Sequence, residues 1–209
     1  IKEYGDIGIY ATSTEPTDLV QANEHIESYI RMVKASKCYQ GGVFLESPTD
    51  SFLKDIVVVA LGDDNWGGTN YSPTCYGIKT GAGAGATIIS KCHAYGYMRY
   101  TYELFGGSTR LFDSIGEGGI LGQIYVGVDG VQVSRGRYFS GYLANGASIR
   151  AINQGIVVAE NVKDCKFQTD IFFCNQGGVV FLGAGSGGKN IVECVIFATD
   201  NAGAAATPV

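Results

Sequence analysis

The stretch Asn153-Gln154-Gly155-Ile156-Val157-Val158 is echoed by Asn175-Gln176-Gly177-Gly178-Val179-Val180, which begins 22 residues further along the chain, from position 153 to position 175. A second stretch, Asn161-Val162-Lys163-Asp164-Cys165, returns as Asn190-Ile191-Val192-Glu193-Cys194, with 29 residues between the two cysteines. The strand-like parts recur while the segments between them vary in length. Internal similarity at a spacing of about 20 to 50 residues indicates stacked repeat units.

A shared frame extends this repeat toward the N-terminus. An aliphatic residue stands three positions before a cysteine, and a small or apolar residue two positions after it, at 89/92/94, 162/165/167 and 191/194/196, with valine replacing cysteine at 56/59/61. Short apolar segments separated by Gly, Asn, Asp and Ser exclude helical repeats. We therefore predict an all-β parallel β-helix of about six or seven coils. A β-sandwich is the alternative, but it explains only the alternation and not the recurring frames.

This register makes specific predictions about the interior. Stacking at roughly 4.8 Å per strand aligns equivalent side chains in columns. One inward column is predicted to contain Val59, Cys92, Cys165 and Cys194, and the next Leu61, Ala94, Phe167 and Ile196.

Only one segment shows helical periodicity. Apolar residues recur with a helical period between positions 17 and 36, after Pro16 and before Gly41-Gly42, at Leu19, Ala22, Ile26, Ile30 and Val33. We predict an α-helix over residues 17–36 that caps the open end of the coils. Residues 1–52 are accordingly assigned to an N-terminal strand and capping region, and residues 53–209 to one continuous β-helix that is either complete or part of a longer chain.

Composition narrows the classes of partner. The chain has 209 residues, 45% of them hydrophobic, and no apolar run near the roughly 18 residues that cross a bilayer. We expect a folded domain without membrane insertion. The net charge of −5, with Lys and Arg scattered along the chain, argues against a nucleic-acid partner. His25 and His93 stand alone, so no metal site and no cofactor is predicted.

Six cysteines, at positions 38, 75, 92, 165, 174 and 194, could belong to disulfides or to a core. A chain of this length has core enough without disulfides, although the column spacing would permit a Cys165–Cys194 bridge. We expect free thiols. Free buried thiols are typical of proteins that fold in a reducing cytoplasm, including those that act outside the cell.

Carboxylates and aromatic residues are the remaining candidates for a site. Glycoside hydrolysis needs two carboxylates about 5 to 10 Å apart, and sugar rings stack on aromatic faces. The candidate catalytic residues are Asp63, Asp64, Asp113 and Glu117, and the inter-coil pairs Asp164/Glu193 and Asp170/Asp200 are weaker alternatives. The candidate carbohydrate-binding residues are Asn65, Trp66, Asn70, Tyr71, Tyr95, Tyr97, Tyr100 and Tyr102. A polar turn and solvated surface acids are the alternative interpretation of these residues.

The N-terminal segment resembles a known family. Ile1-Lys2-Glu3-Tyr4-Gly5, the predicted helix and Gly41-Gly42-Val43-Phe44-Leu45 are similar to the opening of pectate-lyase-like right-handed β-helix proteins, especially phage tailspikes. The sequence departs from that pattern at Thr12-Ser13-Thr14-Glu15 and at Glu46-Ser47-Pro48, and no catalytic motif of the family is present. The resemblance implies a right-handed coil, a homotrimer and a place in the virion tail.

Three functions follow as expectations. The first is a tailspike-like domain that binds a bacterial surface polysaccharide, capsule or O-antigen, during host attachment, with or without hydrolysing it through paired carboxylates. The second is a non-catalytic structural virion protein, such as a tail fibre or decoration protein, that contacts other virion proteins. The third is a secreted polysaccharide lyase of the pectate-lyase type, which would require a cluster of acids for Ca²⁺ that is not visible in the sequence.

Overall fold

The computed structural model describes residues 7–11, 29–38, 40–47, 49–61, 75–139, 154–172, 177–183 and 189–197. All regular structure in these ranges is β, and the strands form a single 17-stranded sheet. None of the described segments forms a helix long and apolar enough to cross a membrane. The strands are β1 (Ile7–Ala11), β2 (Tyr29–Arg31), β3 (Lys34–Cys38), β4 (Gly41–Leu45), β5 (Phe52–Lys54), β6 (Val57–Leu61), β7 (Tyr76–Thr80), β8 (Ile88–Ser90), β9 (His93–Leu104), β10 (Arg110–Phe112), β11 (Ile115–Val126), β12 (Gln132–Phe139), β13 (Gln154–Val158), β14 (Lys166–Phe172), β15 (Val179–Phe181), β16 (Ile191–Val192) and β17 (Val195–Phe197).

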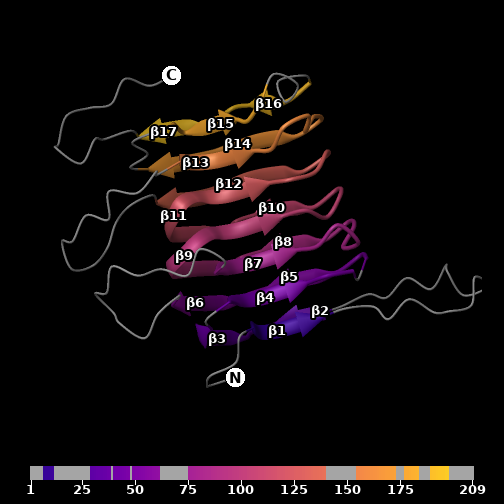
Figure 1. Cartoon of the computed structure of the whole chain (residues 1–209), viewed down its shortest axis with the longest axis vertical. Helices are drawn as coiled ribbons and strands as arrows, with labels where there is room; N and C mark the ends of the chain where they lie inside the picture. Colours follow the sequence, from indigo (N-terminus) through magenta and orange to yellow (C-terminus); the bar gives the residue numbers. More distant parts are fainter. Residues whose placement is uncertain are drawn as a thin grey trace, which may run out of the picture.

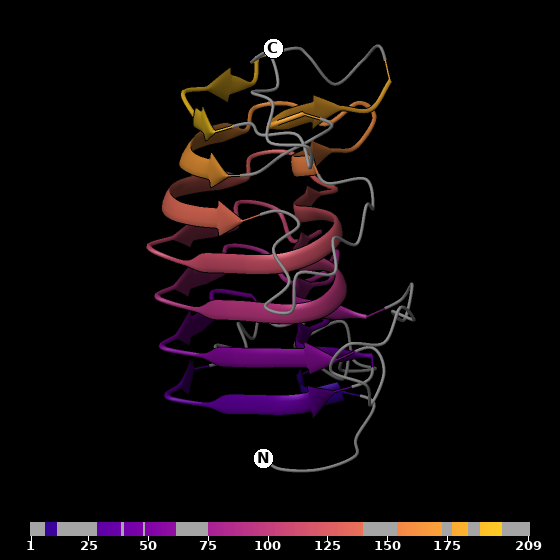
Figure 2. The same cartoon turned by 90° about the vertical axis from the view of Figure 1, so that its left-hand side faces the viewer.

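Every strand pairing is parallel, and the pairings form three series that we call ladders. Ladder A joins β1, β4, β7, the end of β9, the end of β11, β13 and β15. Ladder B joins β2, β5, β8, β10, the start of β12, the start of β14 and β16. Ladder C joins β3, β6, the starts of β9 and β11, the ends of β12 and β14, and β17. The chain visits the ladders in the order A, B, C, and the strands are stacked along the long axis between the two termini (Figures 1 and 2).

The sheet curls around an apolar interior. Each ladder contributes inward columns because side chains alternate along a strand while equivalent positions stack between strands. Examples are Val43 and Ile78 of ladder A, Leu53 of ladder B and Val58 of ladder C, all with no exposed surface. Aromatic side chains fill the same interior further along, where Tyr102, Tyr138 and Phe167 are fully buried.

Two columns of left-handed residues form the corners next to ladder B. Between ladders A and B, one column with φ from 51° to 76° contains Asp50, Ala86, Ser108, Gly130, Asp164 and Lys189, and Asn161 in the same connections has a φ of 64°. Between ladders B and C, the column with φ from 51° to 54° contains Met32, Asp55, Lys91, Asp113 and Arg135. Stacked corners bond to one another, as when the Asp55 amide donates to the Ser90 carbonyl at 3.2 Å. Backbone hydrogen bonds between successive turns of the chain therefore continue through the corners.

A column of glycines lets ladder A approach ladder C. A Cβ on Gly42 would lie 2.1 Å from a methyl carbon of Val58, and one on Gly178 would lie 2.3 Å from Ile196. The glycine of the repeated Asn-Gln-Gly frame, Gly155, stands in this column, where a Cβ would lie 2.4 Å from Ile171. The frame thus marks the point where two ladders touch across the interior.

The predicted helix over residues 17–36 is wrong over its described part. Residues 29–31 and 34–38 are the strands β2 and β3, and residues 17–28 lie outside the described ranges. Ile30 and Val33 do pack against the core, as the helical stripe required. Ile30 does so from β2 and Val33 from the corner after Met32, whose φ of 54° turns the chain, and fully buried Ala35 lies outside that stripe. The boundary predicted at residues 52/53 falls inside β5, and the strands before it pair into the same sheet.

The cysteine column is also wrong in register. Cys92 and Cys194 both directly precede a strand segment of ladder C, whereas Cys165 precedes ladder B. Ala94 and Ile196 share one column, but Phe167 belongs to the ladder B column of Leu53, and Leu61 pairs with Tyr97. The frames matched because each ladder repeats a similar apolar spacing. The described cysteines are free; Cys92 and Cys165 are buried, and Cys194 is half-buried.

Candidate functional site

Six of the candidate site residues lie outside the described part of the chain. They belong to the connection between β6 and β7, and they are Asp63, Asp64, Asn65, Trp66, Asn70 and Tyr71.

The candidate tyrosines of β9 do not form one surface. Tyr102 is fully buried, and its hydroxyl lies 3.0 Å from the Cys92 carbonyl and 2.8 Å from the Ile115 carbonyl. Tyr100 is only 8% exposed and packs against Tyr125. Assigning these two side chains to a sugar-binding surface is therefore wrong. Tyr95 is half-buried, and Tyr97 is described only in its backbone.

Both candidate carboxylates in the described ranges lie beside a basic side chain. The Asp113 carboxylate accepts hydrogen bonds from the Arg135 guanidinium at 3.0 and 3.1 Å. Glu117 lies 3.4 Å from Nε2 of His93, whose ring packs against Tyr95. The two carboxylates thus belong to separate pairs, and neither faces the other as a partner for hydrolysis.

The inter-coil pair Asp164/Glu193 is wrong. Lys166 pairs with Ile191 across the sheet, which places Asp164 opposite Lys189. Glu193 instead accepts a hydrogen bond from the side chain of Gln168. Asp170 pairs with Val195, and Asp200 lies outside the described residues.

A groove runs along the outer side of ladder B. It consists of two hollows of about 520 and 400 Å³ that share Arg110. The first is lined by Arg110, Phe112, Gln132, Ser134, Arg135 and Gln168, and the second by Asp50, Phe52, Ala86, Ile88, Ser108 and Arg110. Since Phe52, Ile88, Arg110 and Gln132 pair in register, the groove crosses successive strands and follows the long axis.

The groove combines flat apolar rings with polar side chains. Near its N-terminal end the rings of Tyr29 and Phe52 are stacked at 5.1 Å, and Tyr29 is 65% exposed. In the first hollow the Arg135 guanidinium lies over the Phe112 ring at 5.5 Å. Amides, a hydroxyl and guanidinium groups line the space between these rings. This mixture of apolar platforms and hydrogen-bonding groups suits a polyhydroxylated ligand.

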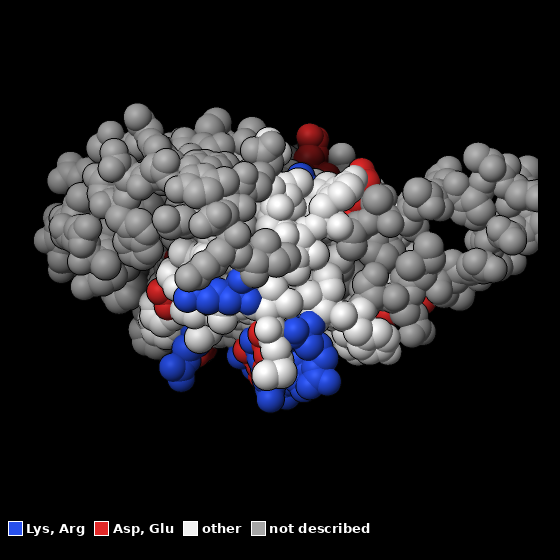
Figure 3. Space-filling view, turned by 90° about the horizontal axis from the view of Figure 1, so that it is seen from below, with Lys and Arg blue, Asp and Glu red and all other residues white. Residues whose placement is uncertain are grey.

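Ladder B carries basic side chains and no acidic one. Its strand segments contain Arg31, Lys54, Arg110 and Lys166, and no Asp or Glu occurs in them. In the described part of the chain, the Arg110 guanidinium has no ion pair or hydrogen bond. Seen from the N-terminal end, most of the visible basic side chains lie toward the lower edge of the view, with acidic side chains among them (Figure 3). The strand segments of ladder B are therefore basic in a chain whose net charge is −5, and the lining of the two hollows combines Arg110 and Arg135 with Asp50.

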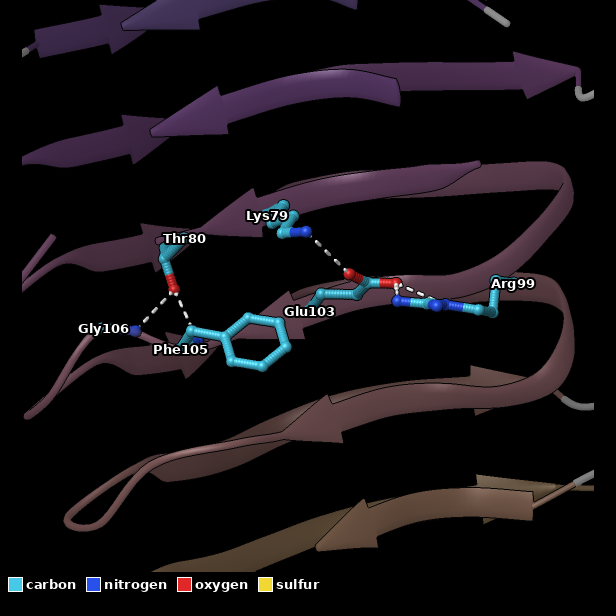
Figure 4. Close-up of polar contacts among 6 residues, drawn as sticks. All are labelled: Lys79, Thr80, Arg99, Glu103, Phe105 and Gly106. Carbon is cyan, nitrogen blue, oxygen red and sulfur yellow. Dashed lines mark hydrogen bonds and ion pairs between the residues drawn. The ribbon is translucent and has the colours of Figure 1, made fainter. Parts of the chain in front are cut away.

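A second polar cluster lies on the outer side of ladder A (Figure 4). The Glu103 carboxylate is fully buried, and one of its oxygens accepts hydrogen bonds from Nε and Nη2 of Arg99 at 2.9 and 2.8 Å. Nζ of Lys79 lies 3.5 Å from the other oxygen and within 5.4 Å of the Phe44, Tyr76 and Phe105 ring centres. Each of the three charged groups has an oppositely charged partner, and in this sense we call the cluster compensated, although two cations share one carboxylate. The cluster joins two strands of ladder A and offers no unpaired charged group to a ligand.

Thr80 extends this connection between the same two strands. Its hydroxyl oxygen accepts hydrogen bonds from the amides of Phe105 and Gly106 at 3.1 Å each (Figure 4). No group of three metal-binding side chains occurs among the described residues.

The groove was missed at the level of sequence, although a signal for it exists. Ile88, Arg110 and Gln132 follow one another at intervals of 22 residues, and each begins a short strand after a glycine-containing turn. The cysteine frames report inward residues, whereas the groove is formed by outward ones. A regular interval at outward positions identifies a surface column.

Comparison with known proteins adds no relative to this picture. No protein-family model, no curated protein and no solved structure matches the chain. The fold and the groove are therefore interpreted from their own residues.

Proposed function

We propose that the chain is a right-handed parallel β-helix of the phage tailspike type, and that its ladder B groove binds a bacterial surface polysaccharide during host attachment. The proposal for the fold is supported by the order A, B, C in which the chain repeatedly visits three parallel ladders. Each turn through the three ladders would be one coil. Such a solenoid shares one core between neighbouring coils.

The groove is the observation that supports polysaccharide binding. An extended glycan is long and repetitive, and the groove likewise crosses strands that repeat at about 4.8 Å. The outer side of ladder B carries exposed aromatic rings and polar groups. The rings are those of Tyr29 and Phe52, and the polar groups are those of Gln132 and Ser134. These groups match the apolar faces and the hydroxyl rims of sugars.

Binding without cleavage fits the described carboxylates best. Asp113, Glu117 and Glu103 each contact a basic side chain, and hydrolysis would need one protonated acid beside one free carboxylate. We therefore propose an adhesin, and if the chain also hydrolyses its ligand, Asp63 and Asp64, which lie outside the described residues, are the predicted catalytic residues to test first.

A structural virion protein is the second candidate function. The observation that favours it is the compensated cluster of Lys79, Arg99 and Glu103, which stiffens one outer side and leaves no group for a ligand. Free cysteines agree with folding in a host cytoplasm under either function.

The test is binding to a panel of capsule and O-antigen polysaccharides from many strains, measured with the wild type, Gln132→Ala and Gln40→Ala. Gln132 is exposed in the groove, whereas Gln40 is exposed outside it and provides the matched control. Loss of about one hydrogen bond predicts an affinity about fivefold weaker for Gln132→Ala only. Shortened oligosaccharides would identify a hydrolase, and failure of every polysaccharide to bind would favour the structural protein.

A further inference from the structure

We propose that the ligand of the ladder B groove is an acidic glycan, whose carboxylates are bound by Arg110 at the junction of the two hollows. This inference rests on the proposed polysaccharide-binding function and specifies its ligand class. Arg110 is the single residue that lines both hollows, so a chain lying along the groove must pass it.

The charge distribution supports an anionic ligand. Four basic residues and no acidic ones occur on the strand segments of ladder B, although the whole chain has a net charge of −5. Of the two acids nearest the first hollow, Asp113 is bound by Arg135 and Glu193 by the Gln168 side chain. Asp50 lines the second hollow and has its own partner. Among these groups the guanidinium of Arg110 is exposed and uncompensated.

The chemistry of the guanidinium points to carboxylate. A planar guanidinium with several N–H donors binds a carboxylate through two parallel hydrogen bonds, which are stronger than bonds between neutral groups. The neighbouring Gln132 side chain pairs in register with Arg110 on the next strand and can bind sugar hydroxyls. One carboxylate and its adjacent hydroxyls would thus be bound by adjacent strands.

A nucleic acid fits the same surface less well. Duplex DNA carries a phosphate about every 3.4 Å along each strand, whereas the four cations are distributed over six strands spaced at about 4.8 Å. Glycans with one carboxylate per repeat match the lower density of positive charge.

The experiment compares binding of polygalacturonate and of its fully methyl-esterified form, because the ester keeps the sugar backbone and replaces each charged carboxylate by a neutral group. Hyaluronan, alginate and polysialic acid extend the acidic panel, and single-stranded DNA tests for phosphate binding. The variants are Arg110→Gln, Arg110→Lys and the control Arg137→Gln, which makes the same charge change at an exposed position of ladder C. Circular dichroism and thermal unfolding establish that each variant is folded.

We expect at least one acidic glycan to bind, and its affinity to fall about tenfold in Arg110→Gln. Arg110→Lys should recover part of that loss, and Arg137→Gln should bind within about twofold of the wild type. Equal binding of the ester and the acid, with Gln132→Ala still weakening both, would overturn the acidic preference and leave the polysaccharide groove intact. Equal losses in Arg110→Gln and Arg137→Gln, or tighter binding of DNA, would also overturn it. Failure of every glycan to bind would overturn both proposals.

Discussion

Single residues at the corners hold conformations that most side chains avoid. Lys91 has a φ of 52° in the column between ladders B and C, where a left-handed backbone costs a non-glycine residue roughly 1–2 kcal/mol. Its amide donates to the Phe112 carbonyl at 3.3 Å, which helps to keep the turn in place. Side chains at these corners are therefore limited by backbone conformation and not by packing.

We expect Lys91→Gly to leave the free energy of unfolding unchanged or to raise it, and Lys91→Val to lower it by about 1–2 kcal/mol. Urea unfolding monitored by circular dichroism measures both. Lys34→Val, at an exposed strand position of β3, is the control and should lie within about 0.5 kcal/mol of the wild type. Equal stabilities of the Gly and Val variants at position 91 would contradict the left-handed corner.

Buried thiols give the protein a predictable response to alkali. Burial raises the pKa of the Cys92 thiol from its ordinary value of 9.0 to about 11 and that of Cys75 to about 12. The folded state therefore retains these protons at a pH where the unfolded chain has lost them. The contribution of the protonated Cys92 thiol to the free energy of unfolding is fully present below pH 9 and is lost as the pH rises toward 11.

The free energy of unfolding should consequently fall between pH 9 and 11, and it should fall less in Cys92→Ala by about 1–2 kcal/mol. Chemical unfolding at several pH values measures the slope, and Cys92→Ala at pH 7 gives its baseline. Identical slopes for the two proteins would show that Cys92 does not ionise differently on unfolding. Rapid alkylation of native Cys92 or Cys165 would likewise contradict their burial.

At the scale of elements, ladder A depends on glycine where it touches ladder C. We expect Gly42→Ala to lower the free energy of unfolding by about 1–3 kcal/mol, because the new methyl group would overlap Val58. Combining it with Val58→Ala should give a smaller loss than the sum of the two single variants. Gly107→Ala, which meets no atom within 4 Å, is the control. Simple additivity would show that the two ladders do not meet there.

The compensated cluster joins β7 to β9 on the outside. Glu103→Gln should lower the free energy of unfolding by about 1–3 kcal/mol, since it removes the charged acceptor that binds Arg99 and Lys79. Asp113→Asn breaks an exposed pair with Arg135 and should cost less than about 1 kcal/mol. Thermal unfolding of the two variants gives the comparison, and equal losses would contradict the distinction between buried and exposed pairs.

The sequence predicted the all-β class and the repeat but not which strands align. The Asn-Gln-Gly frame does report a repeat of ladder A, but its register is wrong by one residue. It aligns Gly155 with Gly177, whereas the pairing of Ile156 with Val179 places Gly155 opposite Gly178. Cys92 and Cys165 look equivalent in sequence because ladders B and C both place an apolar residue near each corner. Residues 29–36 read as helical since Ile30 and Val33 are both core residues, although one lies on a strand and the other at a corner. The groove depends on outward residues such as Ile88, Arg110 and Gln132, whose 22-residue spacing marks a surface column but does not by itself indicate a groove.

At the scale of the whole molecule, assembly is the first open question for experiment. The tailspike proposal includes a homotrimer, and exposed apolar side chains such as Met32, at 81%, offer surface that association would cover. Light scattering coupled to size exclusion should give a mass about three times 22.1 kDa. A monomer at micromolar concentration would contradict the trimer for this chain.

The central claim is that the ladder B groove holds a polysaccharide, and a crystal structure of the protein with the tightest-binding oligosaccharide of the panels tests it most directly. We predict sugar density along the outer side of ladder B, with a carboxylate at the Arg110 guanidinium and sugar rings between Phe52 and Phe112. Density confined to another surface, such as the connection from Asp63 to Tyr71, with the groove empty, would contradict the claim.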